Sequence, residues 1–309
     1  ARISIRANPN VDAKTHPYIS TGLNENKFGV SIETARKMYI YAKKSKFLNP
    51  VGIHFHIGSQ LTDISPICDA AKIVSDLLRE LRALEIDIKF FDVGGGIGIR
   101  YEDEKQIVLY DYAQGILRSL SELDVTIVCE PGRFIAGAAG VFLTRVLYEK
   151  QNCGKRFVIV DGAMNDLIRP SLYGAHHAIE IVSVSGGINL DESGASEVNL
   201  GRTSSDQTNC SCVDEKILGG INLAAVSLCD VVGPICESGD FLAKGVSLPS
   251  LQSGDLLAIK SAGAYGFSMS SNYNTRCRAA EVAVYDGQDR LIRKRESFDD
   301  LIALEKDFV

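Results

Sequence analysis

Residues 90–101 have the sequence FFDVGGGIGIRY, in which a short apolar run is followed by three consecutive glycines and a fourth at Gly98. The apolar run predicts a strand, and the glycines let the backbone turn sharply with no side chains in the way. Such a turn exposes N–H groups, which can bind a phosphate because they supply hydrogen bonds and a positive field without a charged side chain. Taken alone, the stretch is equally well explained as a glycine-rich turn without a ligand.

The spacing of the glycines excludes two familiar nucleotide-binding patterns. A dinucleotide fingerprint would need glycine at the position of Ile99, and a Walker loop would end in Gly-Lys-Ser or Gly-Lys-Thr, which is absent. The stretch therefore indicates a phosphate-binding turn of another kind, or a turn with a purely structural role.

The composition is typical of a globular protein of the cytoplasm. With 309 residues and 45% hydrophobic content, the chain can bury a sizeable core in one large domain or two ordinary ones. No apolar run approaches the roughly 20 residues that span a bilayer, and the N-terminal residues do not form an export signal. The net charge of −6 argues against nucleic acid as the main partner, and we expect no membrane partner.

The eight cysteines are scattered, and most of them lie in apolar segments, as Cys129 and Cys229 do. This placement fits reduced thiols better than a disulfide framework. Cys210 and Cys212 form a C-x-C pair, but no partners at ligand spacing accompany them. We interpret them as two free thiols and expect no metal site.

The first part of the chain alternates between expected strands and helices. The strands are expected at residues 2–7, 51–57, 90–93 and 126–129, and the helices at residues 31–42, 65–84 and 111–120. Ser31 predicts a helix N-cap, Pro66 marks the start of the second helix, and Asp111 with Gln114 predicts a capping box for the third. This alternation calls for parallel strands covered by helices.

The pattern changes after Ala136 to short β-like runs without long helices. We therefore expect an α/β domain at residues 1–136 and an all-β domain at residues 137–309. A polar stretch rich in glycine and serine, at about residues 185–224, predicts a long mobile insertion in the second domain.

Polar residues gather where the expected strands end, and chemistry in parallel α/β proteins gathers at those ends. His54 and His56 lie two apart and would point to one face of a strand, either as a metal pair or as core or stacking imidazoles. Glu130 and Arg133 flank Pro131 and Gly132, and they form either a structural ion pair or a site at which Arg133 binds a phosphate or carboxylate.

Six motifs in a fixed order resemble one family over nearly the whole chain. They are HFHIGSQ, DVGGGIG, CEPGR, DLIRPSLYGA, VVGPICESGD and GAYG, beginning at His54, Asp92, Cys129, Asp166, Val231 and Gly263. Together they resemble the fold III decarboxylases that depend on pyridoxal phosphate, and within that family the members that act on diaminopimelate. One such motif is a modest signal, whereas six with approximate spacing are specific.

The resemblance implies a fold, an assembly and a cofactor. The family has an N-terminal (β/α)8 or TIM barrel of the alanine racemase type, followed by a C-terminal β-sandwich or β-barrel domain, and forms homodimers with active sites at the subunit interface. It implies pyridoxal 5′-phosphate as the cofactor, with these residues around it: His56, Ser59, Gly94, Gly95, Gly96, Glu130, Gly132, Arg133 and Tyr265. His56 would stack on the ring, the glycines would bind the phosphate, and Glu130 would keep the pyridine nitrogen protonated.

The resemblance also implies residues for the substrate and for proton transfer. The expected substrate ligands are Arg133, Arg169, Tyr173, Glu237 and Tyr265. The arginines would bind the distal carboxylate and Glu237 the distal ammonium, while Cys236, from the partner subunit, would reprotonate the carbanion. In a simpler interpretation Arg169 and Tyr173 cap a turn, and Cys236 is one more buried thiol.

Glu237 and Arg169 together favour a substrate that carries both an ammonium group and a carboxylate at its distal end. The resemblance therefore implies decarboxylation of meso-2,6-diaminopimelate to L-lysine and carbon dioxide, the last step of lysine biosynthesis. A related decarboxylase acting on ornithine, arginine or carboxynorspermidine is the alternative within enzymes. A decarboxylase-like regulator without catalysis is the alternative outside them.

The sequence departs from the family in two places. The resemblance begins at about the fifth barrel strand, and no lysine matches the family's Schiff-base motif; Lys14 and Lys27 lack its context. We therefore expect the chain to be part of a longer enzyme and inactive alone. The insertion is the second departure, and it is expected either to cover the active-site cleft or to extend into solvent.

Overall fold

The computed structural model describes residues 1–13, 21–22, 27–183 and 226–308. These residues form two compact units, the first made of 1–142, 165–178 and 259–309, and the second of 143–164 and 179–258. The expected insertion at 185–224, the Cys210 and Cys212 pair and Lys14 lie outside the described residues. Within the described part of the chain, no helix combines the length and the apolar character needed to cross a membrane.

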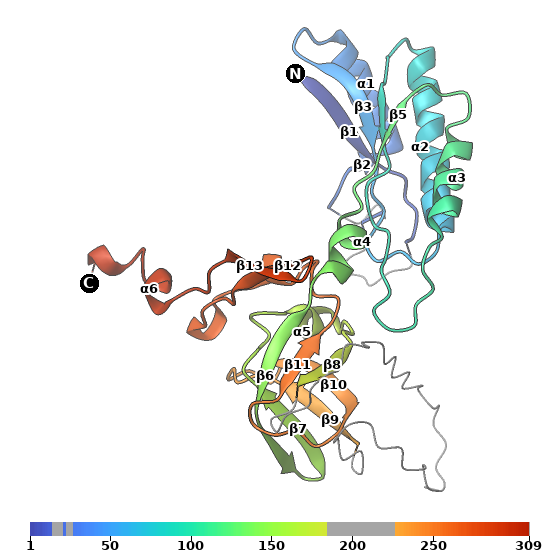
Figure 1. Cartoon of the computed structure of the whole chain (residues 1–309). Coiled ribbons are helices and arrows are strands. Elements are labelled where there is room, and N and C mark those ends of the chain that lie inside the picture. The colour runs from blue at the N-terminus through green and yellow to red at the C-terminus, as the bar shows by residue number, and fades with distance from the viewer. Residues whose placement is uncertain (14–20, 23–26, 184–225, 309) are drawn as a thin grey trace, which may run out of the picture. The chain divides into compact units, whose positions relative to one another are not determined.

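The first unit contains a five-stranded parallel sheet with the order β2-β1-β3-β4-β5 (Figure 1). Its strands are β1 (Arg2–Asn8), β2 (Val30–Ser31), β3 (Asn49–His54), β4 (Phe90–Asp92) and β5 (Thr126–Val128). The four strands expected from the sequence are confirmed, and the register places His54 beside Asp92 and Asp92 beside Val128. The carboxyl ends of three strands therefore lie at one edge of the sheet.

Three longer helices accompany this sheet: α1 (Ile32–Lys44), α2 (Ser65–Ala83) and α3 (Leu109–Ser119). The Ser31 side chain accepts a hydrogen bond from the Thr34 N–H, so the predicted N-cap of α1 is confirmed. The capping box at Asp111 is wrong, because α3 begins two residues earlier at Leu109 and has no side-chain cap. The sequence therefore predicted the start of α1 but not the start of α3.

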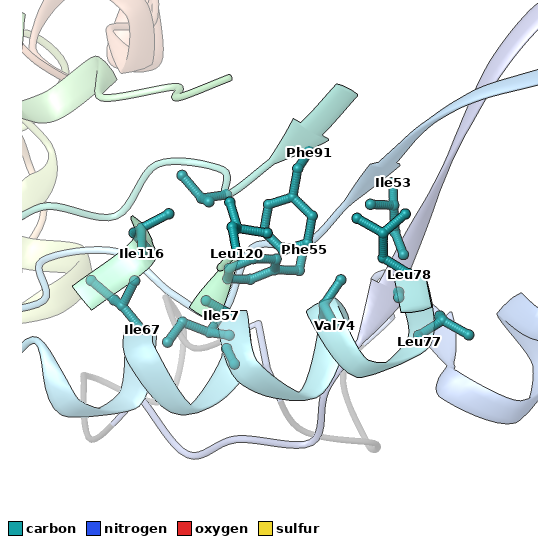
Figure 2. Close-up of a cluster of buried hydrophobic side chains, with 14 of the residues drawn as sticks. Ile53, Phe55, Ile57, Ile67, Val74, Leu77, Leu78, Phe91, Ile116 and Leu120 are labelled. Atoms are coloured by element: carbon teal, nitrogen blue, oxygen red, sulfur yellow. The ribbon is translucent and has the colours of Figure 1, made fainter. Parts of the chain in front are cut away.

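The core of the first unit lies between the sheet and the helices (Figure 2). Ile53 of β3 and Phe91 of β4 are 0% exposed, and the Phe55 and Phe91 rings meet edge to face with their centroids 5.9 Å apart. Helix α2 contributes a continuous buried stripe, namely Ile67, Ala70, Ala71, Val74, Leu77, Leu78 and Leu81. Leu84, the last residue of the helix expected at residues 65–84, follows α2 and is 37% exposed.

The second unit is built on a six-stranded sheet with the order β10-β9-β7-β6-β11-β8. The strands are β6 (Phe142–Asn152), β7 (Lys155–Val160), β8 (Ile179–Ser183), β9 (Ser227–Val232), β10 (Phe241–Leu248) and β11 (Leu256–Ile259). Neighbouring pairs are mixed: β6 runs antiparallel to β7, and β7 runs parallel to β9. The change from alternating α/β to mainly β structure is therefore confirmed.

The remaining elements are short. They are α4 (Gly132–Ala136), α5 (Arg169–Tyr173), α6 (Phe298–Leu301), the hairpin β12 (Glu281–Tyr285) and β13 (Gln288–Arg293), and the 3-10 turns at Gly137–Ala139, Phe267–Met269, Tyr273–Thr275 and Lys306–Phe308. Residues 165–178 and 259–309 belong to the first compact unit, although the sequence pattern assigned them to the β domain. The domain boundary near residue 136 stays a prediction.

Candidate active site

Three polar side chains meet at the carboxyl edge of the parallel sheet. His54 ends β3, Asp92 ends β4, and Glu130 lies two residues beyond β5. One ligand atom from each of the three lies within 4.8 Å of the others. His54 Nε2 is buried without a hydrogen bond among the described residues, and Glu130 Oε2 lies 3.6 Å from it. This edge therefore presents an imidazole and two carboxylates to whatever binds there.

His56 is held by contacts on both its backbone and its ring. Its carbonyl oxygen accepts hydrogen bonds from Arg6 Nη2 at 3.1 Å and Thr21 Oγ1 at 2.9 Å. Its Nδ1 accepts the Gly95 N–H at 3.1 Å, so the neutral ring carries its proton on Nε2. Burial, the charge of Arg6 and His54 lower the pKa of His56 to about 4. The ring is therefore neutral near pH 7.

The strand β3 ends at His54, two residues before His56. Residues two apart point to the same face only when both lie in a strand. The expectation that His54 and His56 share a face for this reason therefore does not hold. His54 lies beside the two carboxylates, whereas the His56 ring is bonded to the glycine turn. Among the described residues, the group of three ligand residues at this edge contains His54 but not His56.

The glycine turn uses some of its N–H groups within the protein. The Gly94 N–H donates to Asp92 Oδ1 at 2.9 Å, and the Gly95 N–H donates to His56 Nδ1 at 3.1 Å. The expected row of unoccupied donors is therefore only partly present. Phosphate binding by Gly94, Gly95 and Gly96 stays a prediction, and the two bonds give the turn a second task, which is to orient side chains at the edge.

Close backbone packing explains why this turn is made of glycine. A Cβ on Gly95 would lie 2.1 Å from the Glu130 carbonyl oxygen. A Cβ on Gly96, which has a φ of +103°, would lie 2.3 Å from the Gly58 carbonyl oxygen. Neither space can hold a methyl group, because contacts below 3.0 Å require the backbone to move.

Arg133 lies at the centre of a second cluster in the first unit. It is 6% exposed, and it donates from Nη1 to the Tyr101 hydroxyl at 2.6 Å and from Nη2 to Ser59 Oγ at 3.1 Å. Its guanidinium carbon lies 4.7 Å from the centre of the Tyr265 ring. The structure thus brings together Ser59, Arg133 and Tyr265, and within the described residues Arg133 bonds to hydroxyls rather than to Glu130.

Tyr265 has a φ of 59°, in the left-handed region that a tyrosine rarely adopts. Strained backbone of this kind persists where the surrounding structure fixes it, often at functional sites. The neighbouring Gly263 is packed against Ala136, whose carbonyl oxygen would lie 2.0 Å from a Cβ. The turn that presents Tyr265 beside Arg133 is therefore fixed by its own packing.

Arg169 begins α5 and is 5% exposed. Its guanidinium carbon lies 4.6 Å from the centre of the Tyr101 ring, and its Nη1 lies 2.6 Å from His177 Nε2. The Nε atoms of Arg169 and Arg133 are both buried without a partner among the described residues. A turn-capping role does not account for a buried guanidinium, so this arrangement favours the anion-binding interpretation.

Cys236 and Glu237 lie in the second unit, on a turn that Asp240 holds. Asp240 is 4% exposed, and its carboxylate accepts the N–H groups of Ile235 and Met164, each at 2.7 Å. Cys236 itself is exposed, so the interpretation as a buried thiol is wrong. Asp240 closes the CESGD motif, but the sequence alone gave it no separate role.

Four further residues of the first-unit site were not expected from the sequence, and Asp92, which ends β4, is one of them. Arg6 could have been found, since it is a charged residue near the end of the first expected strand. Tyr101 closes the opening glycine-rich stretch, but its contacts come from Arg133 and Arg169, far away in the sequence. His177 has no sequence signal, because its partners are Arg169 and the backbone of Lys260.

Two histidines, the half-buried His56 and the buried His177, should make the stability of the fold depend on pH. His56 and His177 have pKa values lowered to about 4, first of all by burial. The unfolded chain, with histidine near its usual 6.5, binds more protons between pH 6.5 and pH 4, so stability is lost as pH falls through this window. We expect the free energy of unfolding to fall by about 3 kcal/mol per histidine across it.

Urea unfolding curves of the complete enzyme, recorded between pH 7 and pH 4, measure this loss. In a His177→Phe variant, the free energy of unfolding should fall less between pH 7 and pH 4 than it does in the parent, whatever the absolute stability of the variant. A variant with the same pH slope as the parent would contradict the assignment of this slope to His177.

Comparisons with known proteins show the family of this chain. Residues 1–137 match the family model of the pyridoxal-binding domain of pyridoxal-dependent decarboxylases. Over 310 aligned residues the chain is 60% identical to diaminopimelate decarboxylase of Campylobacter jejuni, covering 100% of this chain and 68% of that protein. It is 52% identical over 305 residues to the Helicobacter pylori J99 enzyme, of which it covers 66%. The chain belongs to the diaminopimelate decarboxylase family.

Solved structures of the same family show the same fold. The Helicobacter pylori diaminopimelate decarboxylase complexed with L-lysine superposes with a TM-score of 0.85 at 51% identity, covering 100% of this chain and 68% of that one. The M. jannaschii enzyme, also in complex with L-lysine, gives a TM-score of 0.80 at 35% identity and is covered to 64%. The expected fold III class is confirmed, and the chain spans about two thirds of the length of these relatives.

Proposed function

We propose that this chain forms the greater part of an enzyme that decarboxylates meso-2,6-diaminopimelate to L-lysine and carbon dioxide. The observation that carries the proposal is the pair of buried arginines, Arg133 and Arg169, that share Tyr101. Two guanidinium groups with buried, unpartnered Nε atoms suit a substrate that keeps one carboxylate while another is lost. Curated relatives at 60% and 52% identity bear the name of this activity.

The carboxyl edge of the sheet fits pyridoxal 5′-phosphate. Glu130 offers a carboxylate that is 54% exposed, His56 offers a neutral ring, and His54 Nε2 is buried without a hydrogen bond. These groups match a pyridinium ring, which needs an anionic partner at its nitrogen and a flat surface against its face. When bound, the cofactor supplies an electron sink for the electron pair that the departing carbon dioxide leaves behind.

Each residue of the edge then has a physical task. Glu130 would keep a proton on the ring nitrogen of the cofactor, because a nearby carboxylate favours the charged form. His56 would stack on that ring, and the Gly95 N–H keeps the imidazole in one orientation. The glycine turn, Ser59 and the backbone at Gly132 and Arg133 would hold the phosphate; the Gly132 N–H already donates to the Glu130 carbonyl oxygen at 2.8 Å, which leaves the Arg133 N–H and the Ser59 hydroxyl as the further donors.

The substrate ligands divide between the two compact units. Arg133 and Arg169 bind the retained carboxylate, with Tyr173 and Tyr265 beside them. Glu237 accepts the ammonium group, and Cys236 delivers the proton that replaces the lost carboxylate. In the homodimer that we propose, this pair comes from the partner subunit, and its exposure on the turn held by Asp240 is compatible with such a role.

The alternative functions would use these residues differently. Ornithine has no distal carboxylate, and a buried arginine pair would then lack its counter-ion. A non-catalytic regulator needs none of these side chains, yet His56, Glu130, Arg133, Cys236 and Glu237 are all present. The enzyme acting on diaminopimelate uses all of them, and we place it in the cytoplasm.

The release of L-lysine from meso-diaminopimelate tests this function directly. With added pyridoxal phosphate, we expect release by the complete gene product and none by residues 1–309 alone. The chain lacks the family's Schiff-base motif; Lys27, one of the lysines considered, lies with Nζ 5.1 Å from the centre of the Phe28 ring. Lysine release by the isolated chain would contradict the second expectation. Release of diamines from ornithine or arginine by the complete product, and not of lysine, would replace the substrate.

A further inference from the structure

His177 is a fully buried residue to which neither the family resemblance nor the comparisons give a role. It is 1% exposed, and both ring nitrogens have partners in the first unit. Nδ1 lies 2.8 Å from the Lys260 carbonyl oxygen, and Nε2 lies 2.6 Å from Arg169 Nη1. The ring therefore connects a strand-end backbone to one of the two arginines of the site.

These two contacts determine where the ring carries its proton. A carbonyl oxygen only accepts, so Nδ1 must be the protonated nitrogen. A guanidinium only donates, so Nε2 must be the acceptor. The neutral Nδ1–H tautomer satisfies both partners, whereas a protonated ring would set an N–H of its own against the N–H of Arg169. Burial lowers the pKa of His177 to about 4, which keeps the ring neutral near pH 7.

The backbone on which His177 rests is itself fixed. The Lys260 N–H donates to the Ala178 carbonyl oxygen at 2.8 Å, so the segments that follow His177 and precede Ser261 are bonded to each other. On its other side the His177 ring meets the Tyr101 ring edge to face, with the centroids 5.2 Å apart. The imidazole thus cannot turn without breaking a hydrogen bond or an aromatic contact.

Arg169 contacts both of these rings. Its Nη1 is bonded to His177, its face lies over Tyr101 at 4.6 Å, and its Nε is left buried without a partner among the described residues. We propose that His177 is a positioning residue that fixes the Arg169 guanidinium, so that its remaining donors face the retained carboxylate of the substrate. The proposal rests on the proposed function, and it makes His177 a determinant of specificity for a ligand with that carboxylate.

Binding of two diamines to the complete holoenzyme tests this role. L-lysine and cadaverine differ only in a carboxylate, so their affinities separate the anion site from the rest of the pocket. In a His177→Phe variant the ring remains but the acceptor is lost. We expect L-lysine affinity, measured by calorimetry, to fall about 10- to 100-fold, as for the loss of a hydrogen bond to a charged group, and cadaverine affinity to stay the same. The KM for meso-diaminopimelate should rise by a similar factor, with a smaller change in kcat.

A second variant and a matched control keep the test decisive. His177→Gln retains an acceptor near the position of Nε2, so it should recover part of the lost L-lysine affinity. His176→Phe places the same substitution on the neighbouring exposed residue, and it should leave both affinities unchanged. Equal losses for L-lysine and cadaverine would show a structural role only and would overturn the proposal.

Lysine release by the parent enzyme and L-lysine binding by the His177→Phe variant test the proposed function and the role of His177 separately. A parent enzyme that releases no lysine would contradict the proposed function. A parent that releases lysine, together with a His177→Phe variant of unchanged L-lysine affinity, would overturn the role of His177 alone.

Discussion

A Glu130→Gln substitution should lower kcat by about 10²- to 10³-fold, a loss typical of removing one electrostatic contact from a catalytic site. The glutamine keeps the size of the side chain but carries no charge, so it does not favour a proton on the ring nitrogen of the cofactor. The substrate ligands that we propose, Arg133 and Arg169, are unchanged, and the KM should move much less than kcat. Steady-state lysine release by the complete enzyme measures both.

A matched control for this substitution is Glu80→Gln. Glu80 is 57% exposed, close to the 54% of Glu130, and its carboxylate also lies beside a basic side chain, with Arg36 Nε 3.2 Å away. It lies on α2 rather than at the carboxyl edge of the sheet. We expect kcat to stay within about twofold, since surface ion pairs of this kind contribute little. A Glu130→Gln enzyme as active as the Glu80→Gln enzyme would remove Glu130 from the mechanism.

The rule that chemistry gathers at the ends of parallel strands predicted much of this site from sequence. It selected His56, the glycine turn, Glu130 and Arg133, because local patterns of apolar residues and glycines show where strands stop. The register then brings these ends together without further information. Hydrophobic periodicity also predicted the buried stripe of α2, where the local pattern and the tertiary packing agree.

The parts that could not be predicted depend on contacts between distant segments. His177, Arg169 and Tyr101 meet although about 70 residues separate Tyr101 from the other two. No local sequence pattern predicts that Arg169 is buried in contact with the His177 ring. The start of α3 was predicted wrongly for a different reason: Asp111 has the residue type of a capping box, but the helix begins at Leu109 without a side-chain cap, and Leu109 and Tyr110 in its first turn are exposed.

The glycine turn shows how a correct local interpretation can be incomplete. The sequence predicted a sharp turn with accessible N–H donors, and the turn is present. Two of its donors, on Gly94 and Gly95, bond to Asp92 and His56. Close packing and the orientation of side chains therefore require glycine in this turn, in addition to any role in phosphate binding. Substitution of single glycines can distinguish the packing requirement from phosphate binding.

A Gly95→Ala substitution should destabilise the protein by about 2–4 kcal/mol and abolish most of the lysine release. Its methyl group would lie 2.1 Å from the Glu130 carbonyl oxygen, so one of the two backbone segments must move. Movement of Gly95 would break the hydrogen bond to His56 Nδ1, and movement of Glu130 would displace its carboxylate. Urea unfolding and steady-state turnover of the complete enzyme measure the two losses.

Gly132→Ala is the matched control, because it makes the same change at the other glycine expected near the phosphate. No atom lies within 4 Å of a Cβ at Gly132, and the residue begins α4, where alanine is favourable. Its N–H is retained, so we expect stability within about 0.5 kcal/mol of the parent and nearly full turnover. If the two variants behave alike, close packing is not what requires glycine at position 95. If Gly95→Ala alone fails, the strand ends are packed so closely at this turn that glycine is required even before a ligand binds.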